Sequence, residues 1–233
     1  MIIELPKKFS YTEDRYNYAN VRNGKLIIKG SVDFEKLMYE LTYAIKGKGN
    51  CYYCGKQVKK ITIDHMFPRD YGGISITNNL LPACQKCNSE KSNLNFHEYQ
   101  IFKTLNQLEK EAFRERVYRQ NERKREKKGF NIPNSWVRTV HFSRIFVRVF
   151  FNQTLYKGKK YNRYTNFIKK YGHLPKPIIL SGNFVLLDGF TILACAKEQG
   201  IHNIPVVILE NVEVIWKKET PRLSRGVWLL VNS

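Results

Sequence analysis

The sequence predicts an α+β fold built from two different kinds of domain. Two close cysteine pairs bracket a short segment of polar and turn-forming residues, which favours a small unit clamped by a metal ion. Apolar residues at helical spacing flank this unit on both sides. The last third of the chain reads as strand, turn, strand, helix and strand, the order of a small α/β domain. We therefore predict one domain at residues 1–128, with its core at 51–93, and a second at residues 129–233.

The amino-terminal residues predict a hairpin followed by a helix. A short strand at 25–30 follows Asn23-Gly24, a dipeptide that favours the tight turn of a hairpin. Apolar residues then recur at helical spacing between residues 34 and 41, and Asp33 precedes them as a cap. We expect this helix to pack on the metal-clamped unit.

The cysteine pairs are Cys51/Cys54 and Cys84/Cys87. Thiolates are soft ligands, and two pairs complete the tetrahedron that Zn²⁺ prefers. Gly55 supports this, because it permits the positive φ that a metal-binding turn needs. The alternative is two disulfides or four unrelated thiols. Disulfides belong to secreted chains, and the first residues lack the apolar core of a signal peptide. We therefore expect a cytoplasmic protein with a structural zinc ion.

The segment between the pairs predicts a compact supersecondary unit. Ile61–Ile63 alternates β-forming residues, so it reads as a short strand that delivers Asp64 and His65 at its end. Proline and glycine residues at 68–73 predict a loop, from which the chain returns to the second cysteine pair. A helix then begins, with Asn88 as a cap. The predicted order is strand, loop, strand and helix, with zinc at the base.

These residues carry a resemblance. The segment from Cys51 to Asn93 resembles an HNH endonuclease of the ββα-metal type. The matching pieces, in chain order, are Asp64-His65, Pro68, Gly72-Gly73, Asn79-Leu80, Cys84-Gln85-Lys86-Cys87-Asn88 and Lys91. The third motif residue of the family is often histidine, and Asn88 takes that place here, a variant that the family tolerates. The resemblance implies a ββα-metal HNH module with a structural zinc ion, flanked by helices.

The resemblance also implies a role for each motif residue. Hydrolysis of a phosphodiester needs an activated water and stabilisation of charge on the leaving oxygen. His65 is the expected general base, although a lone histidine is more often a surface or core residue. Asp64 and Asn88 offer oxygen ligands for a catalytic Mg²⁺ or Mn²⁺ ion. Asn79 would hold the loop so that His65 is oriented. The expected products carry 5′-phosphate and 3′-hydroxyl ends.

The charge of the chain favours nucleic acid as a partner. Lys and Arg number 40 against 20 Asp and Glu, which gives a formal net charge of +20. Such a field attracts polyanions and makes binding depend on salt. No apolar run is long enough to span a membrane. We predict DNA as the partner, and pairing into a homodimer if both strands are cut. The residues expected to contact DNA are Arg69, Lys86, Lys91, Arg123, Lys124 and Arg125.

Residues 96–128 predict one long helix or two that abut. The second half is strongly basic with interleaved glutamates, so it either contacts phosphates or forms a solvated linker helix. Gly129–Pro133 marks a natural boundary. The apolar stripe expected for this segment is formed by Ile101, Leu105, Leu108 and Ala112.

The carboxy-terminal third, from Lys176 to Glu210, resembles a ParB/sulfiredoxin-like domain, because Asp188-Gly189 lies between a strand and a helix. In that family the turn precedes basic residues that bind phosphates or nucleotide. No basic residue follows directly here, so we expect neither nucleotide binding nor catalysis by this domain. We interpret Asp188 as a turn residue and Cys195 as a core thiol. The basic and aromatic run at 156–164 is a further nucleic-acid contact candidate.

Three functions compete on these residues. The predicted function is a metal-dependent DNA endonuclease, an HNH-type phosphodiester hydrolase. The alternative is a non-catalytic DNA-binding protein stabilised by zinc, against which the complete set of motif residues argues. A third is an enzyme whose activity lies in the carboxy-terminal domain, which the missing basic residues disfavour.

Overall fold

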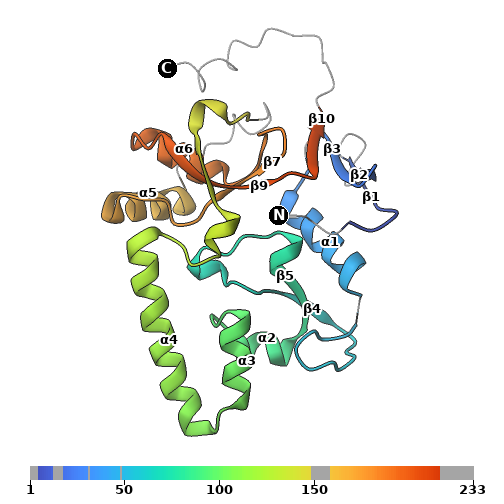
Figure 1. Cartoon of the computed structure of the whole chain (residues 1–233), viewed down its shortest axis with the longest axis vertical. Helices are drawn as coiled ribbons and strands as arrows, with labels where there is room; N and C mark the ends of the chain where they lie inside the picture. Colours follow the sequence, from blue (N-terminus) through green and yellow to red (C-terminus); the bar gives the residue numbers. More distant parts are fainter. Residues whose placement is uncertain (1–4, 13–17, 31, 48, 148–157, 216–233) are drawn as a thin grey trace.

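A computed structural model describes residues 5–12, 18–30, 32–47, 49–147 and 158–215. In Figure 1 the helices α2, α3 and α4 and the strand β4 form the lower part of the molecule. The strands β7 and β9 with the helices α5 and α6 form the upper part, and the amino-terminal strands lie at one side. Short 3-10 helices, named η, connect several elements. They are η1 (Arg69–Tyr71), η2 (Thr77–Asn79), η3 (Asn134–Trp136) and η4 (Phe142–Arg144).

The amino-terminal hairpin forms as predicted. Its turn residues Asn23 and Gly24 have φ angles of 50° and 72°, the positive values that a two-residue hairpin turn requires. The chain's last described strand joins the same sheet, because β10 pairs parallel with β3. The strands, in spatial order, are β1 (Ser10–Thr12), β2 (Tyr18–Arg22), β3 (Lys25–Lys29) and β10 (Val212–Ile215).

Helix α1 (Phe34–Lys46) follows this hairpin, and the predicted cap is confirmed. The Asp33 side chain accepts a hydrogen bond from the Lys36 amide at 3.1 Å. The apolar residues predicted for one face, including Leu37 and Leu41, are buried. The helix contacts β5 and η2 of the cysteine-bearing unit and also β8 of the carboxy-terminal sheet. It therefore packs on the cysteine-bearing unit, as predicted, and on a second neighbour as well.

The cysteine-bearing unit has the predicted order of strand, loop, strand and helix. Strands β4 (Ile61–His65) and β5 (Leu80–Cys84) pair antiparallel, and α2 (Gln85–Lys91) follows directly. The predicted cap is wrong. The helix begins three residues earlier than Asn88, and Cys84 is the cap, because its sulfur accepts the Cys87 amide at 3.4 Å. Asn88 therefore lies inside the helix.

Two helices occupy the next segment, α3 (Phe96–Thr104) and α4 (Gln107–Lys128). The predicted apolar stripe is wrong, since Ile101 is 52% exposed and Leu108 is 84% exposed. The break between the helices explains this, because Asn106 starts a new helix with its own capping box and so resets the helical phase. The buried apolar residues are Tyr99, Phe102, Phe113 and Val117. Gly129 ends α4 in the left-handed region, at the predicted boundary.

The carboxy-terminal residues form a mixed sheet against two helices, α5 (Lys159–Tyr171) and α6 (Phe190–Glu198). Gly189 begins α6 at φ 103°, and a Cβ there would lie 2.5 Å from Ile178, so only glycine fits. Cys195 is fully buried, as expected of a core thiol. The strands, in spatial order, are β6 (Arg138–His141), β9 (Asn203–Leu209), β7 (Ile178–Ser181) and β8 (Leu186–Asp188).

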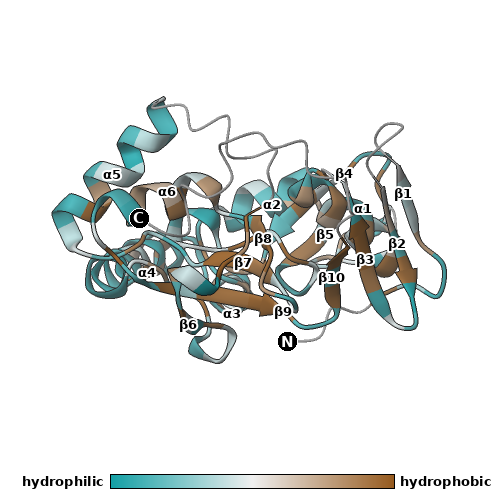
Figure 2. Ribbon diagram, turned by 90° about the horizontal axis from the view of Figure 1, so that it is seen from above, coloured by the Kyte–Doolittle hydropathy of each residue, from teal (hydrophilic) through white to brown (hydrophobic). Residues whose placement is uncertain are grey.

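The largest hydrophobic core among the described residues joins elements from the amino-terminal and carboxy-terminal parts of the chain. It contains Leu26 and Leu37 from the amino-terminal part, Ile76 from the cysteine-bearing unit, and Val207 and Leu209 from the carboxy-terminal sheet. Figure 2 shows the apolar strands gathered in the interior, while α4 is largely hydrophilic. Residues on both sides of the domain boundary predicted at residue 128 therefore contribute to this one core. Among the described residues, no helix has the length and apolar character needed to cross a bilayer.

Candidate active site

The four paired cysteines form one cluster. Their sulfur atoms all lie within 4.8 Å of one another. Tetrahedral zinc with Zn–S bonds of about 2.3 Å places its sulfurs about 3.8 Å apart, so the cluster fits a soft four-coordinate ion. Gly55 has φ +71° and donates its amide to the Cys51 carbonyl at 2.8 Å, which closes the first turn as predicted. All five cysteines of the chain are described, and none of them forms a disulfide.

This cluster fixes the position of β4. The sulfur of Cys51, in the preceding loop, lies within 4.8 Å of the sulfur of Cys84 at the end of β5. Strand β5 pairs with β4 so that Cys84 lies opposite Ile61, and Leu80 lies opposite His65. The cysteines thus anchor one end of the strand pair, and the polar residues Asp64 and His65 emerge at the other.

Asp64 is buried inside the cysteine-bearing unit. Its carboxylate accepts hydrogen bonds from the Tyr53 hydroxyl at 2.5 Å and from the Lys91 ammonium, whose nitrogen is 3.0 Å from Oδ2. The Lys91 side chain is fully buried and also donates to the His65 carbonyl at 2.8 Å. Burial raises the pKa of Asp64 and lowers the pKa of Lys91, since each charge is withdrawn from water. The attraction between the two charges opposes both shifts.

The burial of Lys91 corrects one prediction. We expected this lysine to contact DNA, but its ammonium is occupied by Asp64 and has no exposed surface. Burying an ammonium group is costly unless it is paired, so its place opposite a carboxylate explains its position in the sequence. In this structure Lys91 holds Asp64 and the end of β4 together.

Asn88 lies on the same side of β4 as Asp64. Its side-chain amide donates to the Thr62 hydroxyl at 3.0 Å. Thr62 and Asp64 are two residues apart on the strand, so they share one face. Asn88 and Lys91 are three residues apart on α2, so they share the helix face that covers this strand. The structure therefore brings Asp64 and Asn88 to one face, and His65 points to the opposite one.

His65 makes its contacts on that opposite face. Its Nε2 lies 3.0 Å from the Ser75 hydroxyl, and Ser75 donates to Oε1 of Glu35 at 3.1 Å. Glu35 also accepts from the Tyr39 hydroxyl at 3.1 Å and pairs with Arg69 at 2.8 Å. These contacts form a chain of hydrogen bonds from the imidazole to α1.

The environment of His65 keeps the ring neutral. Its pKa is lowered to about 3, first by burial and then by the positive charges of Arg69, Lys91 and Lys176. A buried imidazole surrounded by cations resists taking up a further proton. The ring is therefore uncharged at neutral pH, with one nitrogen protonated and the other able to accept a hydrogen bond.

Asn79 holds the loop that follows β4. It is fully buried, accepts the Phe67 amide at 2.8 Å, and donates to the carbonyls of Phe67 at 3.1 Å and Ile74 at 2.9 Å. The loop is so tight that a Cβ on Gly73 would lie 1.8 Å from the Phe67 carbonyl oxygen. Because Ser75 follows this loop, Asn79 indirectly positions the hydroxyl that His65 contacts.

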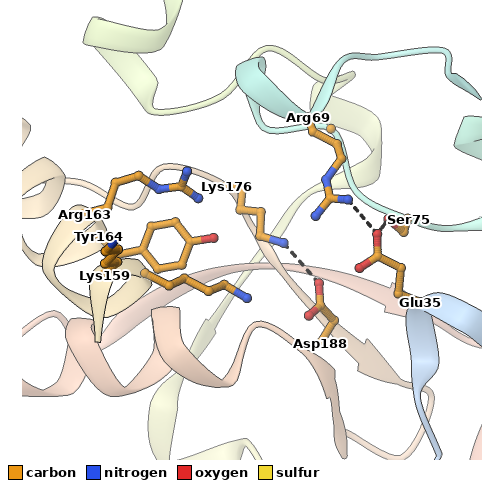
Figure 3. Close-up of a pocket in the computed structure, with 10 residues that line it drawn as sticks. Glu35, Arg69, Ser75, Lys159, Arg163, Tyr164, Lys176 and Asp188 are labelled. Atoms are coloured by element: carbon orange, nitrogen blue, oxygen red, sulfur yellow. Dashed lines mark hydrogen bonds and ion pairs between the residues drawn. The ribbon is translucent and has the colours of Figure 1, made fainter. Parts of the chain in front are cut away.

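A cavity of about 460 Å³ opens beside this hydrogen-bond chain (Figure 3). Arg69 and Glu35 lie on one side of it, and Lys159, Arg163 and Tyr164 lie on the other. Lys176 lies between them, and its ammonium pairs with Asp188 at 3.1 Å. Its lining residues are Glu35, Arg69, Gly73, Ser75, Lys159, Lys160, Arg163, Tyr164, Lys176 and Asp188.

The other residues expected to contact DNA have different surroundings. Lys86, Arg123 and Lys124 are exposed. Arg125 is half-buried, and its guanidinium lies 5.2 Å from the centre of the Phe167 ring. In the run at 156–164, the first two residues lie outside the described part, and both described tyrosines, Tyr161 and Tyr164, are buried.

Sequence reasoning missed Tyr53, Ser75 and Glu35. Ser75 has no spacing that marks it, because its role depends on a loop that brings it back to His65. Glu35 reads as an ordinary residue of an amphipathic helix, and only the packing of α1 on the module places it at the cavity. Tyr53 stands between the first two cysteines, where sequence suggests only a turn.

Comparison with known proteins places one part of the chain. No curated protein matches it significantly. Among solved structures, a Pnob8-like ParB-N domain aligns with 18% sequence identity and a TM-score of 0.28, over 31% of this chain and 28% of that one. This chain thus spans under a third of that structure, and a similarity so low does not establish a shared fold. Residues 51–98, which hold all four clustered cysteines and Asp64, His65, Asn79 and Asn88, match the HNH endonuclease family.

Proposed function

We propose that this protein is a metal-dependent DNA endonuclease whose active site is built around His65. One observation carries the proposal: the segment that matches the HNH endonuclease family holds a buried, neutral histidine fixed in a hydrogen-bond chain. The net charge of +20 supports a polyanionic substrate.

The hydrogen-bond chain selects the nitrogen that acts as base. An ionised Glu35 can only accept, so the single hydroxyl proton of Ser75 is donated to it. The Ser75 oxygen then accepts a hydrogen bond from the protonated Nε2 of His65. In the neutral ring this leaves Nδ1 as the acceptor. We assign Nδ1 as the atom that takes a proton from the attacking water.

The metal requirements follow from the two donor sets. The four cysteines would hold a structural zinc ion, which would fix β4 and β5. Asp64 and Asn88 offer oxygen donors for Mg²⁺ or Mn²⁺ on the face of β4 opposite His65, so a bound phosphodiester would have to reach both groups at the carboxyl end of the strand, where Asp64 and His65 are adjacent. An ion at Asp64 has to compete with Lys91 for the carboxylate. When bound, such an ion would stabilise negative charge on the departing 3′ oxygen, so the products carry 5′-phosphate and 3′-hydroxyl ends.

The experiment is cleavage of supercoiled plasmid by the full chain with Mg²⁺, with Mn²⁺ and with EDTA. His65→Ala should abolish cleavage while keeping the fold and the affinity for DNA. His97→Ala is the matched control, because His97 is an exposed histidine within the same matched segment, on α3. We expect the control to cut like the wild type.

Two results would contradict the proposal. Unchanged cleavage by His65→Ala would remove the assigned base. Tight, salt-sensitive DNA binding without cleavage in any ion would favour the alternative, a zinc-stabilised DNA-binding protein.

A further inference from the structure

The cavity beside His65 lies between the HNH-matching segment and the carboxy-terminal region, and we call it the basic cleft. Arg69, Gly73 and Ser75 come from the loop after β4. The opposite wall comes from α5 and from the residues around β7 and β8. No local motif predicts this site, because its two walls are far apart in the sequence.

The basic cleft has an excess of positive charge. Its lining contains five cations and two carboxylates. Glu35 pairs with Arg69, and Asp188 pairs with Lys176. The three remaining cations are Lys159, Lys160 and Arg163, all exposed on α5, and within the described part of the chain none of them forms an ion pair with a carboxylate. The cleft is therefore suited to an anion.

The electrostatics of Asp188 agree with this. Burial alone would raise its pKa, but the ammonium of Lys176, with a smaller effect from Lys160, lowers it below the ordinary value. The carboxylate thus stays ionised and holds Lys176 in place, while the exposed cations of α5 remain available. Asp188 therefore orients a cation of the cleft, which differs from the turn role expected from the sequence.

The lining favours a phosphate over a base. Tyr164 is the single aromatic residue of the lining, and the Arg163 guanidinium lies 5.3 Å from the centre of its ring. The other lining residues, apart from Gly73, are charged or carry a hydroxyl. A nucleobase pocket needs flat apolar surface for stacking, which this lining lacks.

The position of Ser75 connects the basic cleft to the chemistry. Ser75 lines the cleft and contacts Nε2 of His65 at 3.0 Å. An anion in the cleft therefore lies on the same side of β4 as the imidazole. A phosphate chain held there would run past the Ser75 hydroxyl that orients the proposed base.

We propose that the basic cleft binds backbone phosphates of DNA, so that the carboxy-terminal region positions the DNA strand near His65. This deepens the proposed nuclease function and rests on it.

The test compares two double variants on one helix. Lys159→Ala with Arg163→Ala removes two cations of the cleft. Lys169→Ala with Lys170→Ala removes the same charge from exposed residues at the far end of α5, outside the cleft. Both are made in the His65→Ala background, and the affinity for a duplex oligonucleotide is measured against salt concentration. We expect the cleft variant to lower the salt slope by about 2 and the control to leave it unchanged.

Cleavage by the same double variants with His65 intact gives a second readout. Loss of phosphate contacts that are equal in the ground and transition states raises KM and leaves kcat close to the wild-type value. If the wild type cuts DNA in no ion, the nuclease function fails, while the salt slopes still test the cleft.

Two outcomes would overturn the inference. One is a cleft variant whose salt slope and KM equal those of the control. The other is a nucleoside triphosphate that binds the wild type and not the cleft variant, while DNA binding is the same in both. That result would make the cleft a nucleotide site.

Discussion

The HNH-matching segment and the basic cleft are built in opposite ways. In the segment at 51–98, the cysteines, Asp64, His65 and Asn88 lie within one short stretch and meet through local turns. In the basic cleft, Arg69 and Lys159 meet only because two regions pack together. The comparison teaches that local chemistry can be read from motif spacing, whereas a site between regions becomes visible only in the fold.

Removing the metal from the cysteine cluster should produce the largest difference in local stability between the two regions. Structural zinc contributes about 10–16 kcal/mol of apparent binding energy in small zinc-binding peptides. We expect Cys51→Ser or a chelator to remove amide hydrogen-exchange protection from β4, β5 and α2, and to leave β7 and β9 protected. Hydrogen exchange followed by mass spectrometry, with zinc analysis of each variant, checks this.

The control for that experiment is Cys195→Ser. This cysteine is fully buried in the other core and belongs to no cluster of metal-ligating residues within the described chain. It should retain zinc in full. Stoichiometric zinc in Cys51→Ser would show that the cluster is not the metal site.

Breaking the buried ion pair between Lys91 and Asp64 should have the next largest effect, a loss of folding stability. Lys91→Met leaves the Asp64 carboxylate buried without its cation, which costs about 3–5 kcal/mol. We expect a lower urea midpoint for Lys91→Met and partial recovery when Asp64→Asn is added. A Lys91→Met protein as stable as the wild type would contradict the role given to this pair.

The loop clamp should matter less. Asn79→Ala leaves the amide of Phe67 and two carbonyls without their partner, at a cost of about 2–3 kcal/mol. Asn93→Ala removes one bond to Asp70 at an exposed position and serves as the control, with an expected cost below about 1 kcal/mol. Urea unfolding measures both, and equal costs would mean that Asn79 does not clamp the loop.

The smallest effect concerns pH. His65 has a pKa of about 3, so it stays neutral when the pH falls through 6.5, where an ordinary histidine takes up a proton. We expect kcat/KM for cleavage to stay level from about pH 7 to about pH 5, since this ratio reports the free enzyme. A decline centred near pH 6.5 would show a base with an ordinary pKa.

Much of the fold could be predicted from sequence, for reasons visible in particular residues. The hairpin at Asn23-Gly24, the strand that ends at His65 and the fold around Asp188-Gly189 each depend on local preferences. The wrong predictions concern residues whose positions depend on a helix break or on tertiary contacts. The predicted apolar stripe is wrong because a new helix starts after Asn106. The predicted DNA contact of Lys91 is wrong because its ammonium is buried in an ion pair with Asp64. Ser75 and the basic cleft depend on contacts between distant segments, which no local pattern encodes.

The parallel pairing of β10 with β3 has a consequence for how the chain is arranged in space. The last described strand, β10, lies beside β3 of the amino-terminal hairpin, so two segments from opposite parts of the chain share one sheet. The HNH-matching segment lies between these two paired strands in the sequence. A chain shortened before Val212 would leave the edge of β3 open, and damage at one end of the protein would be felt at the other.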